Sequence, residues 1–238
     1  MAGKRTALIT GSNKNIGRAC ALALAKDGCN VVINGSQDRQ AAQKVANEAR
    51  ELGVEALVAM GDVGKREDCM RMAEESLAKF GTVDVLVNNA AVREDGGFLE
   101  LSEDQWRRVM AINFDASYWL SRALLPGMVG KGWGRIINFA GMNAIHGHAG
   151  RTPVSVAKQG VWGLTKALAM EFGPKGVTTN TISPGPIAPD VEEAQASAQS
   201  RAQTLARVPL GRFGQPVEVA AAARLLVSDA GGYINGQM

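Results

Sequence analysis

Short apolar runs of strand length alternate with longer amphipathic stretches along most of this chain of 238 residues. Continuously apolar segments, such as those within Asp84–Val87 and Ile136–Ile137, indicate strands that are buried on both faces, as in a parallel sheet covered by helices. The pattern therefore predicts an α/β fold, a doubly wound, Rossmann-like parallel sheet with helices on both faces in three αβα layers. The predicted strands are Thr6–Thr10, Asn30–Asn34, Glu55–Gly61, Val83–Asn88, Gly134–Phe139 and Thr178–Ser183, and the predicted helices are Ile16–Asp27, Arg39–Leu52, Arg66–Phe80, Ser102–Leu125 and Val154–Phe172.

The length and a hydrophobic content of 46% predict one domain over residues 1–238. The segment 184–214 is rich in Ala, Gln, Ser, Pro and Arg and is long for a plain connection, so we expect a substrate lid there. Gly28, Gly53 and Gly81 stand where helices end in the left-handed conformation, and Ser102 with Gln105 has the spacing of a capping box.

The net charge of +3 is small and evenly scattered, which disfavours binding to nucleic acid or to a membrane surface. No apolar run reaches the roughly 18 residues of a membrane span, and no signal peptide opens the chain, so we expect a cytoplasmic protein. The three cysteines are interpreted as reduced core thiols. The two histidines lie in no pattern of metal ligands, so no metal site is expected.

The segment Thr10–Gly17 lies between the first predicted strand and the first predicted helix. Gly11 allows a tight turn there, and Gly17 allows a close approach of the backbone. A fold of this kind places a phosphate group at the N-terminus of the helix that follows such a turn. The segment is therefore a candidate binding site for a dinucleotide.

These residues resemble the short-chain dehydrogenase/reductase family, whose turn reads T-G-x-x-x-G-x-G, and the resemblance covers practically the whole chain. Asn15 replaces the middle glycine, and asparagine enters the left-handed region at modest cost. Asp62-Val63 and Asn88-Asn89-Ala90-Ala91 match two further motifs, with Ala91 in place of the usual glycine. The residues that the resemblance assigns to an NAD(P) cofactor are Gly11, Asn13, Lys14, Asn15, Ile16, Gly17, Ser36, Asp62, Val63, Asn88, Ala90, Lys158, Pro184, Gly185 and Ile187.

The charge around the expected ribose site favours NADP(H) over NAD(H). Asn34–Ser36 lacks the acidic residue that binds the ribose hydroxyls in NAD-specific members of the family. Lys14 and Arg39 can face a 2′-phosphate group, although both cations fit a solvated surface as well.

The catalytic motif is matched at two of its four positions. Asn113 and Lys158 match the family's asparagine and lysine. Four residues before Lys158, where the family has tyrosine, stands Val154, and 13 residues earlier Gly141 replaces the serine. The lysine of the family lowers the pKa of the tyrosine and holds the nicotinamide ribose, so Lys158 is expected to keep only the second role.

Both histidines of the chain fall in the segment Met142–Arg151, which lines the substrate pocket in relatives. Histidine suits proton transfer near neutral pH, and Arg151 can hold a substrate carboxylate or phosphate. The candidate catalytic residues are His148, which we favour, His146, Asn113 and Lys158; the candidate substrate-binding residues are Asn143 and Arg151.

The sequence thus predicts an atypical oxidoreductase of this family that transfers a hydride between NAD(P)(H) and a small carbonyl or alcohol substrate, with an acid/base other than tyrosine. Two alternatives stay open: a cofactor-independent lyase, dehydratase or dehalogenase-like enzyme, and a non-catalytic dinucleotide-binding protein. The family pairs its long helices across two-fold axes, so a homodimer or homotetramer is expected. Relatives usually continue beyond a segment like Gly232–Met238 through a last strand, so we expect a short chain or a tail beyond Met238.

Overall fold

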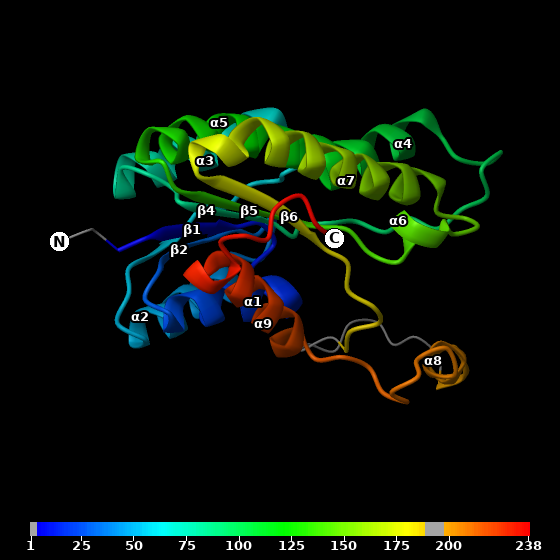
Figure 1. The fold of residues 1–238 in the computed structure, drawn as a ribbon. Coiled ribbons are helices and arrows are strands. Elements are labelled where there is room, and N and C mark those ends of the chain that lie inside the picture. Colours follow the sequence, from blue (N-terminus) through cyan, green and yellow to red (C-terminus); the bar gives the residue numbers. More distant parts are fainter. Residues whose placement is uncertain (1–3, 189–197) are drawn as a thin grey trace.

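Six parallel strands form a single sheet in the order β3-β2-β1-β4-β5-β6, with helices on both faces (Figure 1). The computed structural model describes residues 4–188 and 198–238. Its arrangement confirms the predicted doubly wound α/β fold. The strands are β1 (Thr6–Ile9), β2 (Asn30–Ile33), β3 (Ala56–Val58), β4 (Val85–Asn88), β5 (Gly134–Phe139) and β6 (Val177–Ile182), and the helices are α1 (Asn15–Lys26), α2 (Arg39–Glu51), α3 (Arg66–Phe80), α4 (Glu103–Met110), η1 (Ala111–Asp115), α5 (Ala116–Lys131), α6 (Asn143–His146), α7 (Thr152–Phe172), η2 (Gly173–Lys175), α8 (Ala198–Leu205), α9 (Pro216–Val227) and η3 (Asp229–Gly231).

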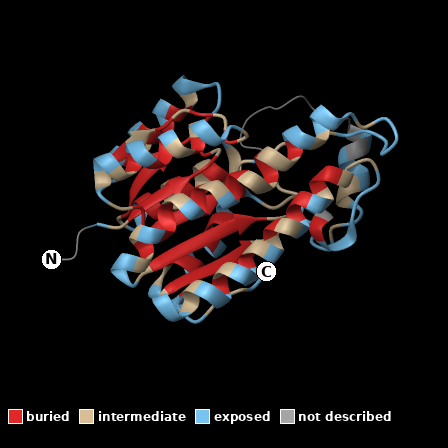
Figure 2. Ribbon diagram, turned by 90° about the horizontal axis from the view of Figure 1, so that it is seen from above, coloured by how far each residue is buried: buried red, intermediate tan, exposed pale blue. Residues whose placement is uncertain are grey.

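The sheet separates two hydrophobic cores. Helices α1, α2 and α9 cover one face, and α3, α5 and α7 cover the other (Figure 1). Because side chains alternate along a strand, Ile9 packs under the first group of helices and Leu8 under the second. The strands themselves are almost entirely buried (Figure 2). The sheet is therefore rigid, and its edges carry the loops that are free to build a site.

The expected ends of the helices are confirmed where glycine or a capping box predicted them. Gly28, Gly53 and Gly81 have φ values of 91°, 83° and 78°. The Ser102 hydroxyl accepts a hydrogen bond from the Gln105 amide at 3.2 Å, and the Gln105 side chain accepts one from the Ser102 amide at 3.0 Å. Local capping chemistry thus sets these boundaries without help from tertiary contacts.

The predicted long helical stretch Ser102–Leu125 is confirmed, with a widened π-helical turn inside it. The structure contains α4, then the π-helical turn η1, then α5, which continues to Lys131. Within η1, the Asn113 side chain accepts a hydrogen bond from the Val92 amide and donates one to the Val92 carbonyl, both at 2.9 Å. A helical pattern in the sequence does not reveal this widened turn, because the partner lies in a distant loop.

The expected lid lies only partly within the described residues. Ile187 pairs with Gly214 in a parallel bridge, and α8 lies within the segment, whereas residues 189–197 fall outside the described part of the chain. After α9 the chain returns to β6, where the Gly236 amide donates to the Thr179 carbonyl and the Thr181 amide donates to the Gln237 carbonyl, both at 2.8 Å. The role of 184–214 as a lid stays a prediction.

The cysteines are free and buried, as expected of core thiols. Burial raises the pKa of Cys20 and of Cys69 to about 12, and that of Cys29 to about 11, so all three are poor nucleophiles. Within residues 4–188 and 198–238, no helix is long and apolar enough to cross a membrane, and no group of histidine, cysteine and carboxylate side chains is arranged to hold a metal ion.

Candidate active site

The turn after β1 is held in place by the side chain of Asn34. Its Oδ1 accepts a hydrogen bond from the Gly11 amide at 3.0 Å, and its Nδ2 donates to the carbonyls of Ala59 and Gly61, both at 3.1 Å. Ser12 is also bound to this residue, because the Asn34 amide donates to its Oγ at 3.0 Å. Asn34 is buried and so ties the ends of β1, β2 and β3 together at the carboxyl edge of the sheet.

The glycine-rich turn has the shape that the sequence predicts. Gly11 has a φ of 60°, and Asn15, the first residue of α1, has a φ of 51° and is the sole non-glycine residue with positive φ in the described ranges. A Cβ atom on Gly17 would lie 2.2 Å from the Gly11 carbonyl oxygen, so only glycine allows the helix to come this close to the turn. The α1 helix begins without a side-chain cap and without an acidic residue in its first turn.

The NAD(P) dinucleotide that the family implies fits these residues. The space that a Cβ on Gly17 would take is occupied by the backbone of the turn, and the uncapped start of α1 directs its first amides towards the carboxyl edge. These amides suit a diphosphate group. Thr10 supports the turn from the other side, since its hydroxyl accepts hydrogen bonds from the amides of Asn89 and Ala90, both at 3.0 Å.

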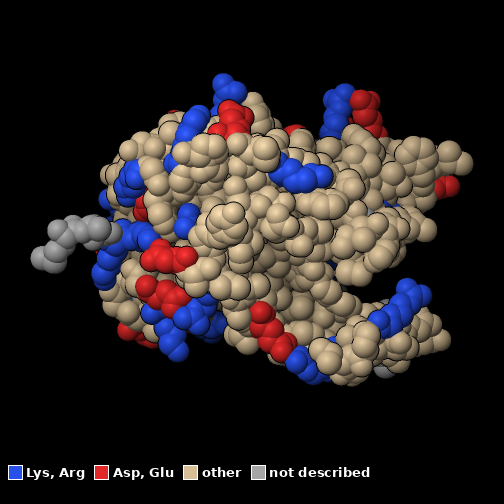
Figure 3. All heavy atoms as spheres, in the orientation of Figure 1, with Lys and Arg blue, Asp and Glu red and all other residues tan. Residues whose placement is uncertain are grey.

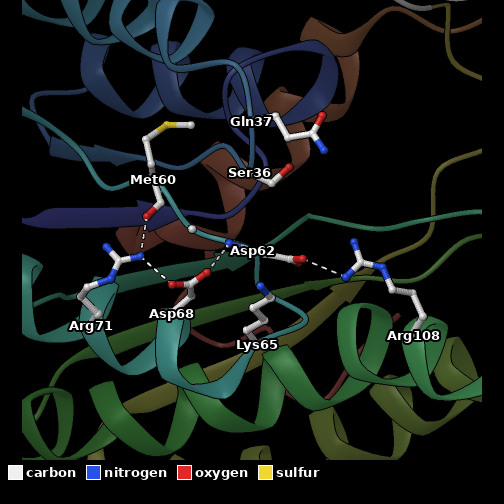
Figure 4. Close-up of a pocket in the computed structure, with 9 residues that line it drawn as sticks. Ser36, Gln37, Met60, Asp62, Lys65, Asp68, Arg71 and Arg108 are labelled. Atoms are coloured by element: carbon white, nitrogen blue, oxygen red, sulfur yellow. Dashed lines mark hydrogen bonds and ion pairs between the residues drawn. The ribbon is translucent and has the colours of Figure 1, made fainter. Parts of the chain in front are cut away.

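A pocket of about 390 Å³ opens beside this turn, at the ends of β2 and β3 (Figure 4). Arg71 is bound to Asp68 at 2.7 Å, and Arg108 is bound to Asp62 at 2.8 Å. The side-chain amine of Lys65, in contrast, makes no hydrogen bond or ion pair within the described part of the chain. The residues that line the pocket are Ser36, Gln37, Met60, Gly61, Asp62, Lys65, Asp68, Arg71 and Arg108.

The carboxylate of Asp62 stays ionised in this pocket. Burial alone would raise its pKa, but the hydrogen bonds from the Arg108 side chain and from the Gly64 amide outweigh that effect and hold the pKa below its ordinary range. The neighbouring Val63 is buried in the core under α3 and does not line the pocket. Of the predicted cofactor residues, Ser36 and Asp62 line this pocket.

Lys158 is the buried cation of the site. It lies on α7, is 6% exposed, and its Nζ donates to the Phe139 carbonyl at the end of β5 at 2.6 Å. Burial lowers the pKa of Lys158 to about 8, and the positive charge of Arg93 adds to this effect. The amine therefore stands at the same carboxyl edge of the sheet as the glycine-rich turn.

Val154 lies one helical turn before Lys158 and is buried. Gly141, just beyond β5, has a φ of 151°, a conformation that other residues rarely adopt, although a Cβ there would meet no atom within 4 Å. Neither position carries a group that donates a proton. A serine at position 141 would fit the space but would strain the backbone.

Asn113 acts on the loop that follows β4. The Oδ1 atom of Asn113 accepts a hydrogen bond from the Val92 amide, and its Nδ2 atom donates one to the Val92 carbonyl. The side chain is 2% exposed. In this arrangement it fixes the path of residues 91–95 past the end of β4. Nearby, Asn88 donates to Asn138 at 2.8 Å, which joins β4 to β5.

The segment with both histidines faces that same loop. Arg151 forms an ion pair with Asp95, and the Gly96 amide donates to the Gly150 carbonyl at 2.9 Å. The hydrogen bond from Arg151 is the main cause of a pKa of Asp95 below its ordinary range, and His148 contributes to the same lowering. Arg151, expected to hold substrate, is thus paired within the protein in this structure.

His146 and His148 are exposed, and the Nδ1 atom of His148 lies 2.6 Å from the Ala149 carbonyl oxygen. Asn143 begins the short helix α6, which ends at His146. Figure 3 shows this face of the molecule hollowed between the part that carries α6 and the part that carries α8, with both signs of charge interspersed around it. The histidines therefore stand in a segment that is open to solvent.

The remaining predicted cofactor residues follow the ends of strands. Asn13 packs against Gly35 after β2, Ile16 lies against the core under α1, and Pro184 and Gly185 follow β6. Lys14 precedes α1 and Arg39 begins α2; both are exposed and neither lines the pocket. Reasoning from the sequence missed the pocket residues Lys65, Arg71 and Arg108, although Lys65 follows Asp62-Val63 closely enough to have been considered.

Residues 11–238 match the family model described as enoyl-(acyl carrier protein) reductase. Nodulation protein G of Azospirillum brasilense is 40% identical over 233 residues, which are 98% of this chain and 94% of that protein. The acetoacetyl-CoA reductase of Allochromatium vinosum is 38% identical over 236 residues, again 98% of this chain and 94% of that protein. A solved structure of a putative NAD(P)-dependent gluconate 5-dehydrogenase from Beutenbergia cavernae, with bound NADP at low occupancy, is 36% identical and superimposes with a TM-score of 0.91 over 99% of this chain and 94% of its own.

The chain belongs to the short-chain dehydrogenase/reductase family, as its motifs predict. Two of these relatives, the acetoacetyl-CoA reductase and the gluconate 5-dehydrogenase, bear the names of oxidoreductases, and with the family model they confirm the prediction of an NAD(P)-dependent oxidoreductase.

Proposed function

We propose that this protein transfers a hydride between NADP(H) and a small carbonyl or alcohol substrate, and that its proton donor is not a tyrosine. The observation that carries the proposal is Lys158, whose buried amine stands at the end of β5 on the same edge of the sheet as the uncapped start of α1. An amine in that position suits the hydroxyl groups of a ribose. The bound dinucleotide supplies the hydride, and the chain supplies binding, orientation and the proton.

The proton of the reaction needs a donor other than Val154 or Gly141. Candidates near the loop after β5 are His148 and His146, and a water molecule held by Asn113 and Lys158 is the remaining one. We favour His148, because its Nδ1 is turned to the Ala149 carbonyl and its Nε2 has no partner among residues 4–188 and 198–238. Asn143 and Arg151 are proposed to contact the substrate, the latter after release from Asp95.

The test combines binding and turnover. Calorimetry with NAD, NADH, NADP and NADPH should give micromolar-range affinity for at least one pair, and the nicotinamide absorbance should change with a panel of β-keto thioesters, sugar acids and simple ketones. Product formed without cofactor would identify a lyase or dehalogenase-like enzyme instead. Binding without reaction over the whole panel would identify a dinucleotide-binding protein that has lost its chemistry.

The preference for the phosphorylated cofactor is a separate prediction. Lys14 and Arg39 are its basis in the sequence, and the pocket adds Lys65, the lining cation whose side chain has no hydrogen bond or ion pair in the described ranges. Removing one charge-assisted contact costs about 1.5–3 kcal/mol, or roughly 10- to 150-fold in affinity. Lys65→Ala should therefore weaken binding of NADP by that factor and leave NAD almost unchanged, as measured by calorimetry. Lys14→Ala is the parallel variant, and equal losses for both cofactors would contradict the assignment to the phosphate.

A homodimer or homotetramer is part of the same proposal. Tyr118 on α5 and Val156 and Met170 on α7 are large apolar side chains exposed on the two helices that the family pairs. Light scattering should give the mass of two or four chains, and the mass of one chain of 25.0 kDa would contradict assembly.

A further inference from the structure

Arg93 lies on the loop that follows β4, at the carboxyl edge of the sheet. Two anchors hold this loop on either side of it. Val92 is bound to the side chain of Asn113 through its amide and its carbonyl, both at 2.9 Å. The Gly96 amide donates to the Gly150 carbonyl at 2.9 Å. The backbone of Arg93 is therefore positioned, while its side chain is exposed to solvent and makes no hydrogen bond or ion pair within residues 4–188 and 198–238.

This loop brings Arg93 close to Lys158. Strand β4 is the neighbour of β5, and the Lys158 amine is bound at the end of β5, to the Phe139 carbonyl. Burial is the main cause of the lowered pKa of Lys158, and Arg93 is the one charged residue of the described chain that adds to it. A like charge has this effect only at short range. The two cations therefore belong to one cluster at the end of β5.

The charge of Arg93 also reaches the segment that carries the histidines. The pKa of Asp95 is held below its ordinary range mainly by the hydrogen bond from Arg151, and the charges of His148 and Arg93 add to this effect. Arg93 is thus near Lys158, which is proposed to hold the ribose of the cofactor, and near the segment of His148, which is proposed to move the proton.

Of the cations gathered here, Arg93 is the one left for a ligand. Lys158 is buried and bound to a backbone carbonyl, and Arg151 binds Asp95 through two of its nitrogen atoms. The adjacent Glu94 does not neutralise Arg93, because one of its carboxylate oxygens is buried without a partner and no ion pair joins the two residues. An exposed cation beside a buried one attracts an anion, and a guanidinium group binds a carboxylate through two parallel hydrogen bonds.

We propose that Arg93 is a specificity-determining residue that binds a carboxylate group of the substrate, so that the substrates are small hydroxy acids and the keto acids formed from them. The role rests on the proposed function and names the class of its substrate. One guanidinium group carries one positive charge, which matches a carboxylate more closely than a phosphate ester with its charge of about −1.5 to −2. Arg93 needs no rearrangement to bind this group, whereas Arg151 must first leave Asp95.

The test compares hydroxy acids with their primary amides, which match them in size but carry no charge, each with NADP. The unaltered protein should favour the acid by about 10- to 150-fold in kcat/KM, the usual effect of one charge-assisted hydrogen bond. In Arg93→Gln this preference should fall to nearly one, mainly through a higher KM for the acid. Arg93→Lys keeps the charge without the paired donors, so it should retain part of the preference.

Arg207→Gln is the matched control. Arg207 follows α8, is also exposed, and its side chain makes no hydrogen bond or ion pair in the part of the chain that the structure describes. This variant should keep the full preference for the acid. Calorimetry with the acid and the amide on the protein loaded with NADP measures the same preference without turnover, and should give the same order of the variants.

The outcomes separate this role from the proposed function. An unaltered protein that turns over the amides as well as the acids, or a preference that is lost in Arg151→Gln or Arg207→Gln but kept in Arg93→Gln, overturns the role of Arg93 and leaves the proposed function standing. Faster turnover of phosphate esters than of acids overturns the carboxylate as the group that is recognised. No turnover of any compound by the unaltered protein overturns the proposed function, and this role with it.

Discussion

Replacing Lys158 by methionine is expected to make the protein more stable and at the same time a poor binder of its cofactor. Lys158 is the one buried lysine among the described residues. Within that part of the chain its amine has a single hydrogen-bond partner, the Phe139 carbonyl oxygen, and no ion pair. A buried cation without a counter-ion destabilises a fold, and a pKa of about 8 for Lys158, against its ordinary 10.5, is the measure of that effect.

Proton linkage explains why the variant is expected to be more stable at neutral pH. Below a pH of about 8, the folded and the unfolded chain both carry the proton of Lys158, and the folded state bears the full cost of burying the charge. Between pH 8 and 10.5 the folded state loses this proton first, so the free energy of unfolding rises with pH. The difference between the two pKa values corresponds to about 3 kcal/mol, of which the lost hydrogen bond to Phe139 in the variant offsets about 1 kcal/mol.

Urea denaturation at pH 7 should therefore show Lys158→Met to be about 2 kcal/mol more stable than the unaltered protein, with the gap narrowing at pH 9.5. Calorimetry at pH 7 should show the affinity for NADP lowered by roughly 10- to 150-fold. The matched control is Lys166→Met, on the same helix, where the lysine is exposed and lies over the ring of Trp162. A variant less stable than the unaltered protein at pH 7, or a gap independent of pH, would contradict this account of Lys158.

The sequence predicts the parts of the site whose physics is local. The left-handed conformation of Asn15, the close approach at Gly17 and the capping box at Ser102 each depend on a few neighbouring residues, and all three are present in the structure. The doubly wound parallel sheet follows from the alternation of apolar strands with amphipathic helices. Local sequence signals therefore predict the turns, the helix ends and the layer arrangement of a fold of this class.

What the sequence does not predict depends on partners distant along the chain. The widened helical turn at Asn113 needs Val92, and the pairing of Arg151 needs Asp95, 56 residues away. The burial of the Ser183 hydroxyl likewise depends on the packing around the end of β6, which pairs with β5. Lys65 could have been predicted as a site residue. It follows Asp62 by three residues, and the first turn of a helix after a strand lies at the ligand-binding edge of the sheet.

Replacing His148 by alanine is expected to lower turnover by about 10²–10⁴-fold, the usual contribution of a general acid or base. Affinity for the cofactor should stay nearly unchanged, because the residue lies in the loop after β5 and not at the glycine-rich turn or the Asp62 pocket. His146→Ala is the comparison that decides between the two candidate histidines: its imidazole is the only other one in the chain, is also exposed, and lies two residues earlier at the end of α6, and a larger loss there than in His148→Ala would assign the role to His146.

Rescue by a restored phenol separates proton transfer from simple contact with the substrate. Val154→Tyr tests the same idea from the opposite side, since a phenol one turn before Lys158 should restore part of the rate lost in His148→Ala if the larger ring fits the buried position of Val154. A His148→Ala protein with full turnover from pH 5 to 9 would exclude this histidine, and the proton would then have to come from His146 or from water held between Asn113 and Lys158.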